Sequence, residues 1–423
     1  MPKMKDTGIV WCPSIPSDWK VRRVKDCFTI SKIKAGIKNP VVLKLARSGI
    51  KVKDVTVNEG QMAESYNEYN PVMIGDLLLN PMDLYSGANC NVSEVEGVIS
   101  PAYVNLRAKQ NINPYFFDYY FKVQYWVMAM FAHGKGVSYD NRWTINAEGI
   151  KNYEIPLPEL STQNRIVKII REKCSQIDAL IANAQQQIEK LKAYKQSVIT
   201  ETVTKGLNPD VPMKDSGVEW IGDIPEHWIC TKIKYVTDVS RGLFNHRPRN
   251  DPRFYNGNYP FIQTGDVAQT TKYITEYGQT LNENGIKVSK KFPKGTLTMT
   301  IAANIGDVAI LNFDAYFPDS VVGYVPNSNC HGNYLYYVFR AMKMVFVNAS
   351  TMNTQLNLNV ERVKNLNMPF ALSIIEQQQI ADFLDTKCSQ IDHIITLKQQ
   401  KIEKLQQYKK SIIYEYVTGK KEV

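Results

Sequence analysis

The sequence lacks any uncharged apolar run approaching the ~18–20 residues of a membrane-spanning helix. Its first residues, MPKMKD, lead into no apolar segment, so we expect no secretory signal and a cytoplasmic protein. The 7 cysteines form no CxxC pair and the 5 histidines lie far apart, which argues against a disulfide framework and a zinc site. With 423 residues, 44% of them apolar and 22% charged, the chain reads as a soluble protein of about two domains.

Motifs for catalysis are also scarce. Asn80-Pro-Met-Asp83 lacks the aromatic residue with which amino-methyltransferases stack on a flipped adenine, and no glycine-rich cofactor turn accompanies it. Gly134-Lys135 and Gly419-Lys420 lack the other residues of a phosphate loop, and no Glu-x-Lys follows Pro318-Asp319 to complete a nuclease site. We therefore predict a chain that is not an enzyme and binds no metal or cofactor; a stand-alone DNA methyltransferase or nuclease is the enzymatic alternative.

What the sequence does contain is a tandem repeat. Residues 4–19 (MKDTGIVWCPSIPSDW) match residues 213–228 (MKDSGVEWIGDIPEHW) at eight of sixteen positions. Residues 174–204 match residues 388–418 at nineteen of thirty-one positions, whereas the stretches between the matched segments look almost unrelated. Each half therefore begins with a segment that both halves share (the head), continues with a segment that differs between them (the middle) and ends with a second shared segment (the tail). We expect a pseudo-two-fold relation between the halves.

Both tails carry apolar residues at alternating spacings of three and four, the 3.5-residue period of a supercoiled helix. Neither contains an internal Pro or Gly, so we predict two helices of about 44 residues, with Ser161 and Ser373 as their N-cap residues. Two ordinary amphipathic helices are the simpler alternative to an intramolecular, antiparallel coiled coil. Lys195 and Lys409 fall at matching seam positions, where a lysine costs stability but restricts register. The predicted apolar seam consists of Ile177, Ile181, Ile188, Leu191, Ile391, Ile395, Ile402 and Leu405.

The two middle segments contain patterns typical of both strands and helices. Strand-like runs occur at 41–45, 77–79 and 296–301, bounded by Gly, Asn and Pro turns. Amphipathic helices are predicted late in each middle, at 114–131 and 333–347. Because the same order occurs twice, we expect the middles to share a fold and to differ in surface.

Positive charge is concentrated in these middles. The chain has 51 basic and 41 acidic residues, a net charge of +10. Residues 20–156 hold seventeen basic and thirteen acidic residues, and residues 229–369 hold fifteen and nine. This balance suits a polyanionic partner, although many basic proteins bind no nucleic acid.

The densest basic segment is 241–255, RGLFNHRPRNDPRFY. Its arginines offer phosphate contacts and bidentate base contacts, and its aromatic rings offer stacking surfaces. An ordinary solvated loop is the alternative. The predicted DNA-binding residues here are Arg241, Phe244, Asn245, His246, Arg247, Arg249 and Arg253.

Three further segments are weaker candidates for DNA contact. Residues 20–25 (KVRRVK) also fit the polar edge of a strand, and residues 133–142 also fit an ordinary surface loop. Residues 351–357 (TMNTQLN) take the corresponding place in the second half, where Asn and Gln either read adenine or cap turns. The candidates are Lys20, Arg22, Arg23, Lys135, Ser138, Tyr139, Asn141, Arg142, Asn353, Thr354 and Gln355.

Over essentially its whole length the chain resembles the specificity (S) subunits of type I restriction-modification enzymes. The resemblance is carried by the head GVEWIGDIPEHW (217–228) and by the segments that lead into the two predicted helices, IPLPELSTQ (155–163) and MPFALSIIEQ (368–377). The CSQID…IEKL…YK helices and TQLNL (354–358) also carry it. The first lead-in segment has Thr162 where the second has Glu376, and the second has Phe370-Ala371 where the family usually has a second proline. Neither departure touches residues expected to read DNA.

The resemblance implies an α+β chain with two globular mixed α/β target recognition domains, joined by two long helices that form an antiparallel coiled coil. The expected boundaries are 1–157 for the first domain, 158–206 for the first helix, 207–369 for the second domain and 370–423 for the second helix. Each domain would read one half of a bipartite, asymmetric double-stranded DNA target. The coil would set the spacing and dock two methyltransferase subunits, which motor-nuclease subunits join.

The resemblance also implies that adenosylmethionine, ATP and Mg²⁺ belong to these partner subunits. A coiled-coil scaffold that binds only proteins is the structural alternative.

Overall fold

A computed structural model describes residues 3–31, 33–36, 40–46, 48–55, 65–82, 84–85, 89–138, 143–302, 304–352 and 356–422. The chain divides into unit 1, which combines Met1–Gln185 with Gln400–Val423, and unit 2, Gln186–Gln399. None of the helices in the described ranges is long and apolar enough to cross a membrane.

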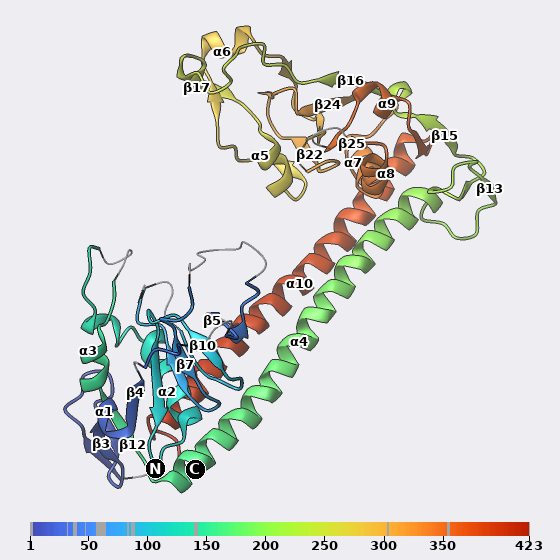
Figure 1. Cartoon of the computed structure of the whole chain (residues 1–423). Helices are drawn as coiled ribbons and strands as arrows, with labels where there is room; N and C mark the ends of the chain where they lie inside the picture. Colours follow the sequence, from blue (N-terminus) through green and yellow to red (C-terminus); the bar gives the residue numbers. More distant parts are fainter. Residues whose placement is uncertain are drawn as a thin grey trace. The chain divides into compact units, whose positions relative to one another are not determined.

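A four-stranded antiparallel sheet forms the centre of unit 1, in the order β4-β11-β8-β9. Its strand β4 is labelled in Figure 1. Its strands are β4 (Phe28–Ser31), β11 (Val104–Ala108), β8 (Leu77–Leu79) and β9 (Cys90–Val92). Helix α2 (Pro114–Trp126) contacts β8 and β9. Asn113 caps α2 because its Oδ1 accepts a hydrogen bond from the Tyr115 amide at 2.9 Å.

Short elements complete unit 1. The head is a β1–β2 hairpin, and β3 pairs with β12, the strand that leads into the first long helix. Two further strand pairs, β5–β6 and β7–β10, lie beside the central sheet. The bounds are β1 (Met4–Asp6), β2 (Ser14–Pro16), β3 (Lys20–Arg23), α1 (Val24–Cys27), β5 (Leu43–Ala46), β6 (Gly49–Val52), β7 (Asn70–Val72), β10 (Gly97–Ile99), η1 (Phe131–His133), α3 (Ala147–Asn152) and β12 (Glu154–Leu157).

Unit 2 repeats this plan with an additional strand. Its sheet has the order β16-β24-β21-β22-β18, and helix α7 (Gly332–Ala341) contacts β21, β22 and β24. The first four strands correspond in order and pairing to β4, β11, β8 and β9, which confirms that the two middles share a fold. The strands are β16 (Thr237–Arg241), β24 (Val321–Pro326), β21 (Leu297–Thr300), β22 (Val308–Leu311) and β18 (Tyr273–Ile274), which pairs parallel with β22.

The remaining elements of unit 2 include a second copy of the head. The hairpin β13–β14 corresponds to β1–β2, and the pair β15–β27 corresponds to β3–β12. The bounds are β13 (Met213–Asp215), β14 (Asp223–Pro225), β15 (Ile229–Lys232), η2 (Ile233–Tyr235), η3 (Pro252–Phe254), β17 (Tyr255–Pro260), α5 (Thr264–Gln269), β19 (Thr280–Leu281), α6 (Glu283–Lys287), β20 (Lys291–Phe292), β23 (Ala315–Tyr316), α8 (Lys343–Asn348), β25 (Thr351–Met352), β26 (Leu356–Asn357), α9 (Val360–Lys364) and β27 (Asn367–Phe370).

The two predicted long helices are present as α4 (Leu160–Lys205, 46 residues) and α10 (Ile374–Val417, 44 residues). Ser373 precedes α10, and its Oγ accepts a hydrogen bond from the Glu376 amide at 3.4 Å. The prediction of an N-cap at Ser161 is wrong, because α4 begins one residue earlier and Ser161 lies inside its first turn.

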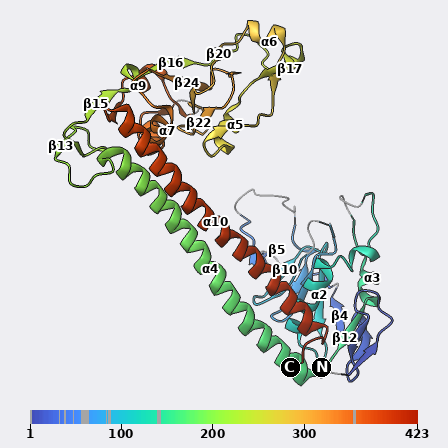
Figure 2. The ribbon, with the colours of Figure 1, turned by 180° about the vertical axis from the view of Figure 1, so that it is seen from behind.

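Segments of α4 and α10 lie side by side within each unit (Figure 2). In unit 2, Lys195 Nζ contacts Asp392 Oδ2 at 2.5 Å and Lys398 Nζ contacts Gln187 Oε1 at 2.6 Å. From Gln187 to Lys195 the residue numbers increase along α4, while those of the contacting residues decrease along α10 from Lys398 to Asp392. The helices are therefore antiparallel, as predicted. The seam residues face inward: Ile177, Ile188, Ile391 and Ile402 are buried, and Ile181, Leu191, Ile395 and Leu405 are half-buried.

Each long helix ends against a copy of the head. Gly206 and Gly419, just beyond the helices, have φ angles of +75° and +69°, a conformation that favours glycine. The Cα of Gly206 lies against Trp228 and Pro225 in unit 2, and that of Gly419 lies against Trp19 and Pro16 in unit 1. The end of α10 therefore meets the first strands of the chain within unit 1 (Figures 1 and 2).

Candidate nucleic-acid interface

The arginine-rich segment of unit 2 connects the end of β16 to β17 and is anchored at its start. The amides of Gly242, Leu243 and Asn245 donate to the carbonyls of Val321, Phe317 and Val288 at 2.9–3.0 Å. The ring of Phe244 is 3% exposed and packs in a cluster with Tyr255 and Phe261. Phe244 therefore serves as an anchor here, and its ring has no free face on which a base can stack. Phe244 is therefore not among the proposed DNA contacts.

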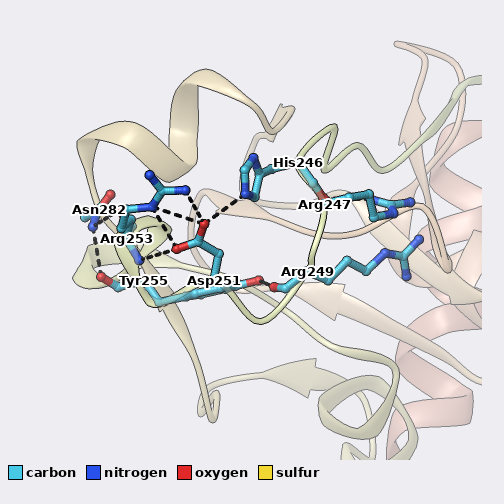
Figure 3. Close-up of polar contacts among 7 residues, drawn as sticks. All are labelled: His246, Arg247, Arg249, Asp251, Arg253, Tyr255 and Asn282. Atoms are coloured by element: carbon cyan, nitrogen blue, oxygen red, sulfur yellow. Dashed lines mark hydrogen bonds and ion pairs between the residues drawn. The ribbon is translucent and has the colours of Figure 1, made fainter.

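Asp251 organises the middle of this segment, hereafter the arginine loop (residues 241–255). Its carboxylate accepts hydrogen bonds from Arg253 Nε, Arg253 Nη2 and the Arg253 amide at 2.7–3.1 Å (Figure 3). His246 Nε2 lies 3.0 Å from Asp251 Oδ2, and its ring lies 4.1 Å from that of Phe254. The hydrogen bonds from Arg253 hold the pKa of Asp251 well below its ordinary value, so this carboxylate is ionised at neutral pH.

Asn282 and Tyr255 brace the far side of the arginine loop. Asn282 Nδ2 donates to the carbonyls of Arg253 and Tyr255, both at 3.0 Å, and the Tyr255 hydroxyl donates to the carbonyl of Arg249 (Figure 3). The loop backbone is thus tied to itself and to Asn282, the N-cap residue of α6. A basic loop held in one conformation presents its cations in fixed positions, which reduces the ordering cost of binding.

Arg247 and Arg249 extend away from the Asp251 network (Figure 3). Their side chains are 58% and 47% exposed, and Arg253, despite its bonds to Asp251, is 75% exposed. Arg241 and Asn245 are also exposed, whereas His246 is half-buried. Exposed guanidinium groups on a rigid loop suit DNA phosphates and the O6 and N7 atoms of guanine.

A second basic segment, residues 287–294, lies beside the arginine loop and is not among the predicted DNA-binding residues. Ser289 pairs with Phe244 in an isolated β-bridge, and its Oγ donates to the Leu243 carbonyl at 2.7 Å. Lys290 Nζ lies 2.9 Å from Ser240 Oγ, at the end of β16. Lys287, Lys290, Lys291 and Lys294 are all exposed. The sequence does show this cluster, because four lysines fall within the eight residues 287–294 (KVSKKFPK).

Two candidate segments of unit 1 lie at different places in its fold. Lys20, Arg22 and Arg23 are exposed on β3, which pairs with β12 next to the start of α4. They therefore lie on the polar edge of a strand, which is the alternative to DNA contact for residues 20–25. Lys135 is exposed, and its backbone pairs with Thr144 in a short bridge, while Ser138 is half-buried. Tyr139, Asn141 and Arg142 lie outside the described residues.

The matching segment of unit 2 is a small hairpin. Strands β25 and β26 pair antiparallel, with Thr351 opposite Asn357. The candidates Asn353, Thr354 and Gln355, which fall between these strands in sequence, lie outside the described residues. Arg362 Nη1 donates to the Ala349 carbonyl at 2.8 Å and so ties α9 to the approach of this hairpin.

The thiols are poor nucleophiles. Burial raises the pKa of Cys12 and Cys27 to about 11 and that of Cys330 to about 12, so all three are protonated at neutral pH. Asn80, the first residue of the methyltransferase-like segment, accepts the Met82 amide on its Oδ1 at 3.0 Å and is used in a turn. Across the described ranges, no three His, Cys, Asp or Glu side chains gather where they would hold a metal ion.

Comparison with known proteins identifies both units with one family. The sequence model described as the type I restriction modification DNA specificity domain matches residues 16–193 and again residues 225–407. The type I restriction enzyme MjaVIII specificity subunit of Methanocaldococcus jannaschii is 24% identical over 440 residues, covering 96% of this chain and 93% of its own. The putative MjaX specificity subunit of the same organism is also 24% identical, over 436 residues, covering 96% and 94%.

Solved structures share the fold. A chain from a structural study of assembly and conformational transition in a type I R-M system matches with a TM-score of 0.73 at 14% identity, over 95% of this chain and 98% of that one. The HsdS subunit from Thermoanaerobacter tengcongensis matches with a TM-score of 0.53, also at 14% identity, over 96% and 98%. The chain therefore belongs to the type I restriction modification DNA specificity domain family and carries two copies of that domain.

Proposed function

We propose that this chain is the sequence-reading subunit of a type I restriction-modification complex and catalyses no reaction itself. Each globular middle reads one half of a bipartite double-stranded DNA target. The observation that carries the proposal is the pair of family domains, with one sheet plan and different loops. Two identical DNA-binding domains related by a two-fold axis require a palindromic target, whereas two different domains select an asymmetric one.

In unit 2 the proposed contacts come from the arginine loop and the lysines beside it. Arg247 and Arg249 are the foremost candidates because they are exposed and extend away from the Asp251 network (Figure 3). Arg241, Asn245, Arg253, Lys287 and Lys290 flank them on exposed surface. His246 is bonded to Asp251 and half-buried, so its proposed role is to shape the loop. In unit 1 the proposed contacts are Lys135 and Ser138, with Tyr139, Asn141 and Arg142.

The long helices are proposed to dock two methyltransferase subunits, which motor-nuclease subunits then join. The support is a set of exposed apolar residues that recurs at matching positions of the two helices. Leu180 of α4 and Tyr408 of α10, both in unit 1, are 47% and 56% exposed. The corresponding Ile394 and Tyr194, both in unit 2, are 41% and 59% exposed. Two copies of one set of exposed apolar residues suit two copies of one partner. Adenosylmethionine, ATP and Mg²⁺ would be bound by these partners.

Domain exchange tests the assignment of half-sites. The chain is produced with its methyltransferase subunits, and the modified bases are mapped across a genome before and after residues 229–369 are replaced by the middle of a relative. We expect an asymmetric bipartite target in which only one half changes. Modification by the purified chain alone would instead favour a stand-alone methyltransferase. Failure of the complex to bind duplex DNA in a salt-dependent manner would favour a protein-binding scaffold.

Heptad deletion tests the role of the helices. Residues 182–188 and the corresponding residues 396–402 are removed together, which preserves the seam period in both helices. Seven residues of α-helix span about 10 Å, or about three base pairs of duplex. We expect the unread gap to shorten by about that amount while the bases read in both half-sites stay the same. Altered half-site bases would contradict the division of labour.

A further inference from the structure

Three arginines of unit 2 converge on one acidic residue, Asp319. Arg249 Nη2 contacts Asp319 Oδ1 at 2.5 Å, and Arg247 Nη2 lies 3.8 Å from Asp319 Oδ2. Arg241 Nε donates to the backbone carbonyl of Asp319. Asp319 lies 70 or more residues from its three partners in sequence, so only the fold brings it to the arginine loop.

Backbone packing fixes the position of Asp319. Its turn connects β23 to β24, and the Val321 amide donates to the Pro318 carbonyl at 3.1 Å within it. The turn is pressed against the start of the arginine loop, because a Cβ atom on Gly242 would collide with the carbonyls of Phe317 and Pro318. The carboxylate is therefore held among the arginines by the main chain and would stay there if an arginine released it.

Asp319 differs from the other carboxylate of the arginine loop. Asp251 is 10% exposed and makes its contacts inside the loop, so it belongs to the framework. Asp319 is 32% exposed, and its two partners Arg247 and Arg249 are about half-exposed. One negative charge also stands among three positive ones, which leaves the cluster with a net positive charge.

A carboxylate and a DNA phosphodiester are alike in what arginine recognises. Each carries one negative charge and presents two acceptor oxygens to the guanidinium fork. The arginine cluster of the free protein is thus partly occupied by an internal anion in an exposed, exchangeable geometry.

We infer that Arg247, Arg249 and Arg241 form a binding site for one backbone phosphate, and that Asp319 occupies this site when DNA is absent. The inference rests on the proposed function and adds a role within it. When DNA binds, a phosphate oxygen takes the place of the Asp319 carboxylate at Arg249 and Arg247. Because every duplex offers phosphates, this internal competitor weakens sequence-independent binding. The same displacement cost applies at a target site, where base contacts supply additional affinity.

Asp319→Asn tests the inference, because it removes the charge and keeps both the shape and the backbone carbonyl that receives Arg241. Binding of the full chain to a mixed-sequence duplex is measured over a range of salt concentrations. We expect affinity at low salt to rise roughly two- to five-fold, the range for loss of an exposed ion-pair competitor. The log–log salt dependence should steepen by up to about one phosphate contact. Asp319→Glu, which keeps the charge, should remain close to the wild type.

Asp307→Asn is the matched control. It makes the same charge change in the same unit, but its partner is Lys343, at 2.6 Å, which is not among the proposed DNA contacts. An equal rise in both Asn variants would reduce the effect to net charge and overturn the inference, as would weaker binding by Asp319→Asn. Thermal unfolding of each variant verifies that the comparison is between folded proteins. If the wild type itself shows no salt-dependent duplex binding, the proposed function fails first; if it binds and only the Asp319 effect is missing, the inference alone fails.

Discussion

Gln163 and Gln377 make the same hydrogen bonds at the start of the two long helices. Gln163 Oε1 accepts the Asn113 amide at 2.8 Å, and Gln377 Oε1 accepts the His331 amide at 2.7 Å; Asn113 and His331 are the N-cap residues of α2 and α7. Gln163 Nε2 donates to the carbonyls of Pro158 and Asn111, and Gln377 Nε2 donates to those of Ala371 and Asn329.

Replacement of Gln377 by Ala should therefore destabilise unit 2 severely. Gln377 is 0% exposed, and its loss leaves one amide and two carbonyls without their partner in a dry environment. We expect the free energy of unfolding to fall by about 3 kcal/mol, as measured by denaturant titration. Gln379→Ala, at an exposed site of the same helix, is the control and should change it by less than about 0.5 kcal/mol. Equal effects at the two positions would contradict a structural role for the buried amide.

The interhelical ion pair Lys195–Asp392 should show measurable coupling. Its N···O distance is 2.5 Å, and the Lys195 side chain is 14% exposed. We expect a double-mutant cycle with Lys195→Ala and Asp392→Ala to give a coupling of about 1 kcal/mol. The exposed pair Lys192–Glu189 on α4 is the comparison and should give about 0.3 kcal/mol. A coupling at Lys195 no larger than that would mean that the pair does not help to fix the register.

Arg249→Ala should weaken DNA binding, and any change in the bases read should be confined to one half-site. We expect a loss of roughly ten-fold, or about 1–2 kcal/mol, with a salt slope reduced by about one contact. The measurement is duplex binding combined with genome-wide mapping of modified bases by the complex. Lys364→Ala removes a positive charge on α9 that is paired with Glu361, and it should leave both readouts close to the wild type. A change in both half-sites would contradict assignment of the arginine loop to a single reader.

Asp251→Asn should loosen the arginine loop without unfolding unit 2. The folded-state pKa of Asp251 is depressed, chiefly by its hydrogen bonds with Arg253. Its contribution to stability is therefore present above the unfolded-state pKa of about 3.9 and is lost as the pH falls through the lower, folded-state value. Hydrogen exchange of residues 246–255 should show protection that persists from pH 7 to pH 5 in the wild type and is lost in the variant. Asp223→Asn, at an exposed site in β14, is the control.

Periodic features of the sequence predicted the frame well. The 3.5-residue spacing of Ile177, Ile188, Ile391 and Ile402 identified the buried face of both helices, because the period depends only on helix geometry. Repetition of that spacing also indicated that the helices pair. Lys195 was expected to weaken the seam, but its partner Asp392 could be named only once the register of α4 against α10 was known.

The candidate site was predicted less completely. Composition located the arginine loop, but it could not distinguish an exposed ring from a buried one, and Phe244 proved to be an anchor. Asp319 reaches the arginines through the pairing of β16 with β24, in which Arg241 stands opposite Val322. Such a long-range contact leaves no trace in local spacing. The lysines at 287–294 are visible in the sequence as a cluster, but their place beside the arginine loop depends on the same kind of long-range contact.

The meeting of Gly419 with Pro16 and Trp19 has a consequence for biosynthesis. Unit 2 is one continuous stretch of chain, so all of its residues are available once position 399 has left the ribosome. Unit 1 needs residues 400–423, among them Ile412, Tyr416 and Val417, which are fully enclosed with Trp19 in its core. The part synthesised first is therefore completed last, and its apolar surface stays uncovered during translation until the final helical turns emerge.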